Sequence, residues 1–117
     1  QLLNEKVIDK RKLRELKRGK IRPEATLDLH GFRRNEAYEL VDNFLDYSVK
    51  KNFRIVLIIT GKGNKSQNHE KKGILRKELP NWISNSNRSS NILALFPASI
   101  NHGGSGAFYV CLRKKNL

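Results

Sequence analysis

Apolar residues recur along this chain with two different periods. The segments 35–51 and 70–84 place apolar side chains three and four positions apart, the spacing of one buried helix face. Segment 54–60 is a continuous apolar, mostly β-branched run, which is typical of a strand covered on both faces and paired in parallel. Shorter apolar runs predict three further strands, at 25–29, 92–96 and 107–112. The predicted order of elements is β-α-β-α-β-β.

This order predicts a two-layer α/β sandwich with a mixed four-stranded sheet. Crossovers between parallel strands are right-handed, so the first helix is expected on one face of the sheet with the second helix beside it. Polar segments at 61–68, 85–90 and 98–106 are expected to be loops. Pro80 lies inside the second helical pattern and is expected to kink or restart that helix.

A basic segment precedes the sandwich. Residues 1–24 contain nine Lys and Arg against four Asp and Glu. Their sparse apolar positions predict a helix that is marginal unless it docks on something, ending near Gly19 and Pro23. We therefore expect a basic N-terminal arm over residues 1–24 and one domain over residues 25–117.

Charge narrows the class of partner. The chain has 24 Lys and Arg against 11 Asp and Glu, a formal net charge of +13, which favours a polyanion such as DNA, RNA or the ribosome. A membrane surface is disfavoured because the apolar stripes are needed for the core. The single cysteine, Cys111, fits a reducing cytoplasm. An organellar matrix is the alternative if a targeting segment preceded Gln1. We expect a monomer.

Asp28 and His30 lie two residues apart at the carboxyl end of the first predicted strand. Alternation puts both on one face, with Leu27 and Leu29 on the other. Open α/β sheets bind ligands at this end of their strands. Histidine can move a proton near neutral pH, and Asp28 would orient its ring. The alternative is that both residues only tie the strand to its turn, with His30 a buried, hydrogen-bonded ring.

A second candidate, Thr60-Gly61-Lys62-Gly63, closes the strand at 54–60. Glycines let backbone N–H groups approach an anion, and Lys62 adds a positive charge. The glycine spacing is not that of a Walker loop, so a plain glycine turn is the alternative. The basic residues that follow are predicted either to contact phosphates or to begin a solvated helix: Lys65, His69, Lys71 and Lys72.

A third glycine-rich loop, beginning His102-Gly103-Gly104, precedes the last strand. It is either a flexible turn or the source of a second proton donor or phosphate ligand, His102. Phe32 is either a core residue or a side chain that stacks on a base. The predicted phosphate-binding residues are Gly31, Thr60, Gly61, Lys62, Gly63, Lys65, His102, Gly103 and Gly104. No spacing of ligands predicts a metal site or an obligatory cofactor, and a divalent cation is expected only for a DNA substrate.

Five motifs in this order resemble the small MutS-related (Smr) domain family. They are Leu-Asp-Leu-His-Gly at 27–31, Asn-Glu-Ala at 35–37, Thr-Gly-Lys-Gly at 60–63, Phe-Pro-Ala at 96–98 and His-Gly-Gly-Ser-Gly-Ala at 102–107. The resemblance covers about residues 25–113. The basic arm and the final motif are similar to those of stand-alone bacterial or organellar members.

The resemblance implies a fold like the C-terminal domain of a bacterial translation initiation factor. It also implies nuclease activity: nicking of DNA, or cleavage of RNA, including messenger RNA at stalled ribosomes. By resemblance, Asp28-Leu29-His30 is the activity motif and Gly61–Gly63 the second motif. Thr60 replaces the commoner histidine of the second motif, which leaves His30, or His102, for acid-base work.

These observations predict an endonuclease in which His30 transfers the proton and Asp28 orients the His30 ring. Lys62 and the loop amides would stabilise the charge that grows on the phosphate. The alternative is a module that binds nucleic acid or the ribosome without cutting it. A third reading is a protein–protein adaptor with incidental basic charge.

Overall fold

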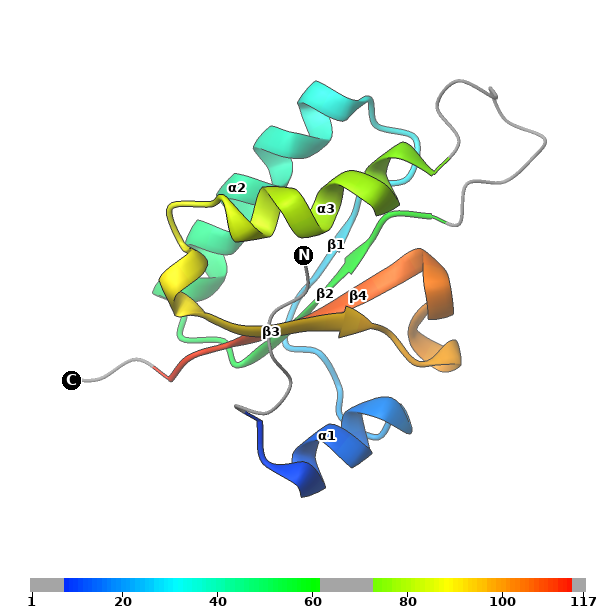
Figure 1. The fold of residues 1–117 in the computed structure, drawn as a ribbon, viewed down its shortest axis with the longest axis vertical. Coiled ribbons are helices and arrows are strands. Elements are labelled where there is room, and N and C mark those ends of the chain that lie inside the picture. The colour runs from blue at the N-terminus through cyan, green and yellow to red at the C-terminus, as the bar shows by residue number, and fades with distance from the viewer. Residues whose placement is uncertain (1–7, 62–72, 115–117) are drawn as a thin grey trace.

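The computed structural model describes residues 8–61 and 73–114, and a mixed four-stranded sheet is its centre (Figure 1). The strands are β1 (Thr26–Asp28), β2 (Ile55–Ile59), β3 (Ile92–Pro97) and β4 (Ala107–Leu112), in the spatial order β1-β2-β4-β3. β1 and β2 are parallel, whereas β4 is antiparallel to both β2 and β3. The predicted α/β fold and mixed sheet are confirmed.

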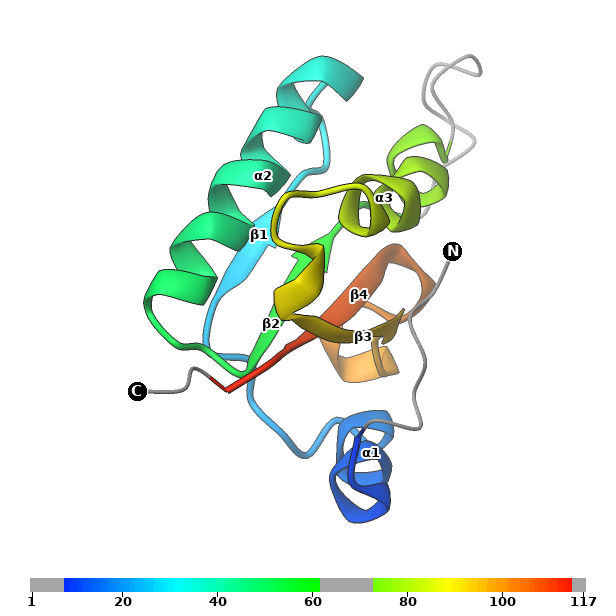
Figure 2. The ribbon, with the colours of Figure 1, turned by 60° about the vertical axis from the view of Figure 1, so that its left-hand side comes forward.

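Two helices cover one face of the sheet, as predicted. α2 (Arg34–Lys50) and α3 (Ile74–Ser84) lie side by side on that face (Figures 1 and 2). Their buried side chains pack with alternate residues of the central strands, including Val56, Ile58 and Val110. The apolar stripe of α2 therefore fulfils the role that its three-four spacing predicts.

The arm helix covers the opposite face of the sheet. α1 (Lys10–Lys17) lies across the sheet from α2 and α3 (Figure 2). Its Leu16 is fully buried, in a second core with Ile55, Leu57 and Tyr109. This docking adds a partial third layer to the two-layer sandwich. It also explains why both faces of β2 and β4 are apolar.

The loop before β4 holds the end of α1 in place. Gly19 has φ +71°, and a Cβ there would lie 2.1 Å from Asn101 Oδ1. Asn101 Nδ2 donates to the Gly19 carbonyl at 3.2 Å. The close approach requires glycine at residue 19, because any side chain would displace Asn101.

The element boundaries differ from prediction by a few residues. α3 begins at Ile74, because Gly73 before it is left-handed with φ +70°, and residues 70–72 lie outside the described ranges. α3 continues through Pro80, so the predicted restart does not occur. Buried Leu79 and Ile83 hold that turn against the core. Short 3₁₀ turns occupy Ser89–Asn91, Ile100–His102 and Gly104–Gly106, within or beside the predicted loops. No described helix has the length and apolar character needed to span a membrane.

Candidate active site at the carboxyl ends of β1 and β2

Asp28 and His30 meet at the end of β1. His30 Nδ1 lies 2.7 Å from Asp28 Oδ1, and the same oxygen accepts the His30 backbone N–H at 3.1 Å. Because Leu29 packs into the core beneath α2 and α3, Asp28 projects from the α1 face of the sheet. The predicted pairing of these two side chains is present.

The His30 ring is exposed rather than buried. The His30 side chain is 73% exposed and that of Asp28 47%. A carboxylate only accepts hydrogen bonds, so the Nδ1–H form of the neutral ring faces Asp28 and leaves Nε2 accessible. The buried, hydrogen-bonded ring of the alternative interpretation is not what the structure contains. Asp28 does, however, also tie the strand end to its turn.

Asp28 remains ionised across the ordinary pH range. Partial desolvation acts to raise its pKa, but the hydrogen bonds from the His30 side chain and backbone, together with the charge interaction, outweigh it. The net result is a pKa below the ordinary aspartate value. An ionised Asp28 accepts the hydrogen bond from the ring and fixes the ring's orientation.

A tight turn presents the ring. The Phe32 N–H donates to the Leu29 carbonyl at 3.1 Å, closing a turn with His30 and Gly31 at its tip. Gly31 has φ +87°, and a Cβ there would have no atom within 4 Å. The tip therefore stands in solvent, with room for a ligand beside the imidazole.

Gly61 brings the end of β2 against His30. A Cβ on Gly61 would lie 3.6 Å from the His30 Cβ, and Gly61 has φ +84°. Thr60 is buried, and its Oγ1 donates to the carbonyls of Gly61 and Gly106. The first half of the predicted phosphate loop is thus beside the ring. Lys62, Gly63 and Lys65 lie outside the described residues, as do His69, Lys71 and Lys72.

The glycine-rich loops bond mainly to themselves. The N–H of Gly61 donates to the Gly106 carbonyl, that of Gly103 to Ile100 and that of Gly104 to Ser99. Anion binding through these amides would require breaking those bonds. These three amides are therefore not free to bind a phosphate in this arrangement.

His102 is held by a residue that the sequence analysis did not single out. Its Nδ1 lies 2.6 Å from the Tyr109 hydroxyl, which is also 3.0 Å from Ser99 Oγ. Tyr109 is fully buried beneath this loop. A tyrosine among aliphatic strand residues was the available signal, because a buried hydroxyl requires a polar partner.

The sheet register separates the two histidines. Asp28 is opposite Ile59, and Ile59 is opposite Ala107. A Cβ on Gly103 would lie 2.8 Å from the Ala107 Cβ, so the His102 loop sits over β4. β1 and β4 are two strand spacings apart, about 10 Å. His30 and the His102 loop are therefore on one face, with β2 between them.

Among residues 8–61 and 73–114, no three His, Cys, Asp or Glu residues come together as a potential metal site.

The fold is a mixed four-stranded sheet with α2 and α3 on one face and α1 on the other, and it carries an exposed carboxylate–imidazole pair at the end of its parallel strands. A family model described as the Smr domain matches residues 27–113, most of the chain. The chain belongs to the Smr domain family.

Particular relatives support this assignment. The chain is 34% identical over 102 residues to "Probable DNA endonuclease SmrA" of Escherichia coli (strain K12), covering 87% of this chain and 52% of that protein. It is 28% identical over 105 residues to "Ribosome rescue factor SmrB" of Aliivibrio fischeri (strain MJ11), covering 90% and 53%. The chain thus spans about half the length of these curated relatives.

Solved structures agree on the fold. YdaL, described as a stand-alone small MutS-related protein from Escherichia coli, is similar with a TM-score of 0.75 and 31% identity. The match covers 97% of this chain and 82% of that one. The Smr domain of Thermus thermophilus MutS2 has a TM-score of 0.63 at 24% identity, covering 76% and 98%, and supports the fold alone.

Proposed function

We propose that this chain is a nucleic-acid endonuclease whose acid-base residue is His30. The observation that carries the proposal is the exposed ring of His30, bonded through Nδ1 to an ionised Asp28 with Nε2 accessible. Relatives named as a ribosome rescue factor and a probable DNA endonuclease support a nucleic-acid or ribosome-bound substrate.

The proposed chemistry needs one proton carrier. Nε2 of neutral His30 accepts the proton of the attacking hydroxyl, and the new P–O bond forms as the P–O bond to the leaving sugar breaks. The imidazolium, hydrogen-bonded to Asp28, then returns the proton to the leaving oxygen. With RNA the ribose 2′-hydroxyl is the attacking group. With DNA an external water attacks, and we expect a divalent cation to assist.

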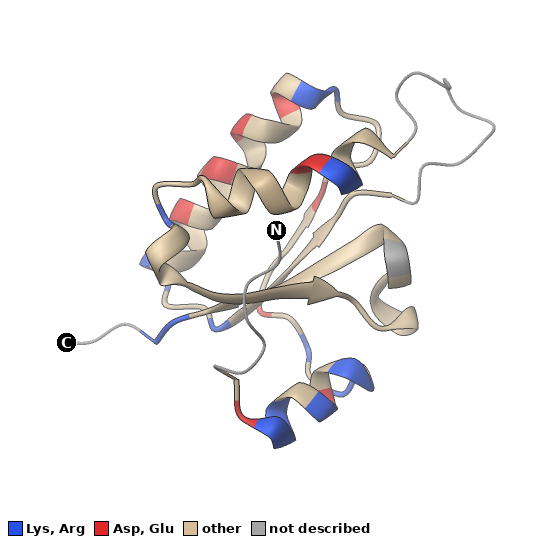
Figure 3. Cartoon of the chain, in the orientation of Figure 1, with Lys and Arg blue, Asp and Glu red and all other residues tan. Residues whose placement is uncertain are grey.

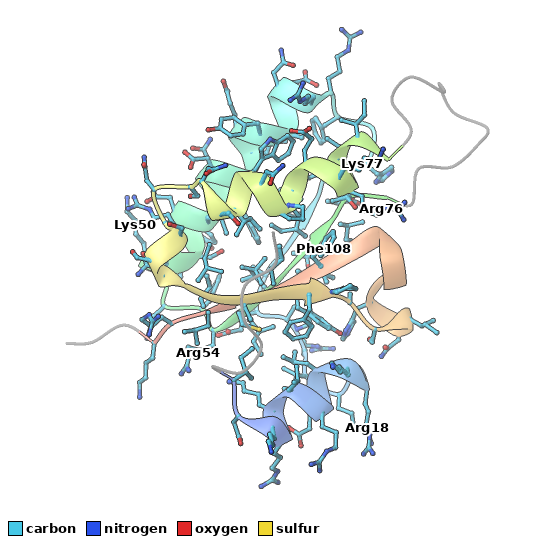
Figure 4. All side chains as sticks on the ribbon, in the orientation of Figure 1. Arg18, Lys50, Arg54, Arg76, Lys77 and Phe108 are labelled. Carbon is cyan, nitrogen blue, oxygen red and sulfur yellow. The ribbon has the colours of Figure 1, made fainter. Side chains whose placement is uncertain are left out.

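Basic side chains would hold the phosphate backbone. Lys and Arg dominate α1, whereas the carboxylates of α2 lie on the other side of the sheet (Figure 3). Arg18 at the end of α1, and Arg76 and Lys77 on α3, lie on the side of the molecule that carries the strand-end loops (Figure 4). Lys62 follows Gly61 directly and is proposed to neutralise the reacting phosphate.

The test compares cleavage with binding. Matched labelled RNA and DNA are incubated with the intact chain, His30→Ala and Asp28→Asn, with and without a chelator. We expect His30→Ala to abolish cleavage and Asp28→Asn to slow it about 100-fold or more, with little change in affinity. Asp42→Asn, on the exposed surface of α2, is the matched control and should cleave normally.

Two results would overturn the proposal. Cleavage of neither nucleic acid by the intact chain, with binding retained, would indicate the binding module instead. Cleavage that persists undiminished in His30→Ala would place the chemistry elsewhere. The ends distinguish the nucleophiles, because attack by the 2′-hydroxyl leaves a cyclic phosphate and attack by water does not.

A further inference from the structure

Phe32 is a half-exposed aromatic residue just before α2. Its side chain is 46% exposed, and it belongs to neither of the two core clusters. None of the ring–ring contacts among the described residues includes it. A single exposed apolar side chain is common on protein surfaces, so the neighbours of Phe32 decide whether it has a role.

Its location is beside the proposed acid-base residue. Phe32 is two residues from His30 and closes the turn that presents the ring, so the two Cα atoms are at most about 7 Å apart. Arg33 and Arg34 follow, both exposed at the start of α2, and Arg34 Nη2 donates to Glu78 Oε1 at 3.1 Å. Phe32 thus stands in the sequence between an exposed imidazole and two arginines, and aromatic rings beside basic groups are typical of sites that bind unpaired bases.

The other exposed aromatic residues lie in different surroundings. Tyr38 and Tyr47 are 52% and 49% exposed on α2, and their rings pack edge-on against Trp82 and Phe53. They lie on the helix that carries the exposed carboxylates Glu39 and Asp42, which repel phosphate, although Lys51 Nζ lies 5.8 Å from the Tyr47 ring centroid. Phe32 thus combines exposure, absence of a ring partner and basic neighbours.

We propose that Phe32 stacks on a base next to the scissile phosphate, and that the substrate is therefore unpaired at this point. This inference rests on the nucleic-acid binding of the proposed function. A base inside a duplex is stacked on both sides, so it can reach the Phe32 ring only when it is single-stranded or turned out of the helix. Phe32 is accordingly a specificity-determining residue for unpaired nucleic acid.

The experiment measures stacking separately from cleavage. Binding is followed in a His30→Ala background, with a fluorescein-labelled single strand of about 12 nucleotides and its duplex. The same strand carrying 2-aminopurine reports stacking, because its fluorescence is quenched when an aromatic ring covers it. Phe32→Leu, Phe32→Tyr and the control Tyr47→Leu are compared, each checked for folding by circular dichroism.

We expect Phe32→Leu to weaken single-strand binding about 5- to 100-fold and to remove the quenching. Phe32→Tyr should restore both, and Tyr47→Leu should change neither. Unchanged affinity and quenching in Phe32→Leu would overturn the inference, as would equal affinity for strand and duplex. Quenching that depends on Phe32 in a chain whose wild type does not cleave would leave the inference standing and the proposed endonuclease refuted.

Discussion

Leu16→Ala tests whether α1 is part of the fold. Leu16 is fully buried against the sheet, and α1 has only eight residues, too few to be stable as an isolated helix. Packing of Leu16 and its neighbours must therefore hold α1 in place. A buried Leu→Ala substitution costs about 2–5 kcal/mol. If the whole loss comes from the free energy that docks α1 on the sheet, the fraction of molecules with α1 undocked rises about 30- to 4,000-fold.

Cys111 provides the assay. It is the one cysteine in the sequence, is 4% exposed, and lies in the core that α1 covers. Burial raises the pKa of its thiol to about 12, although nearby Lys12 opposes the shift. Because the thiolate is the reactive form, labelling at about pH 8 should be slow while α1 is docked. Leu16→Ala should accelerate labelling, up to the rate of an exposed thiol, and should lower the free energy of unfolding in urea.

Leu79→Ala is the matched control. Leu79 is also fully buried, but it belongs to α3 and packs on the other face of the sheet. Leu79→Ala should lower the free energy of unfolding by about as much as Leu16→Ala does, without accelerating the labelling of Cys111 under native conditions. The reasoning is refuted if Leu16→Ala costs less than about 1 kcal/mol, or if both substitutions accelerate labelling equally.

Four further substitutions test the site and the loop before β4. Gly103→Ala should cost more free energy of unfolding than Gly31→Ala, by about 1–3 kcal/mol in thermal or urea unfolding, because both have positive φ but only the first meets the Ala107 Cβ. The Asp28→Asn effect on stability should be present at neutral pH and shrink below about pH 4. The reason is that a carboxyl group whose pKa is lowered by folding stabilises the fold only while it is ionised. Urea unfolding of both proteins at several pH values checks this, and a difference in free energy of unfolding that stayed constant with pH would contradict it. Ile100→Ala should change the free energy of unfolding by less than about 0.5 kcal/mol, because Ile100 is 93% exposed. A larger loss would show that Ile100 packs against other residues of the fold.

The local sequence pattern was sufficient to predict most helices and strands and the Asp28–His30 pair of the site. The three-four spacing in residues 35–51 predicts α2 within a residue at each end, and the apolar run at 54–60 predicts β2 as a strand covered on both faces. The Asp28–His30 pairing follows from a separation of two residues, a distance that the backbone itself sets. Such features depend on neighbours in the chain, so the amino-acid order determines them directly.

Contacts between distant residues required the tertiary structure. The sequence showed sparse apolar positions near Leu16 but not the sheet face that buries them. It showed a glycine at residue 19 but not Asn101, 82 residues later, filling the space beside it. His102 was a candidate proton donor by type, whereas its bond to Tyr109 and its place over β4 depend on strand order. Periodicity specifies which side chains are buried, and only the packing of the whole chain specifies what buries them.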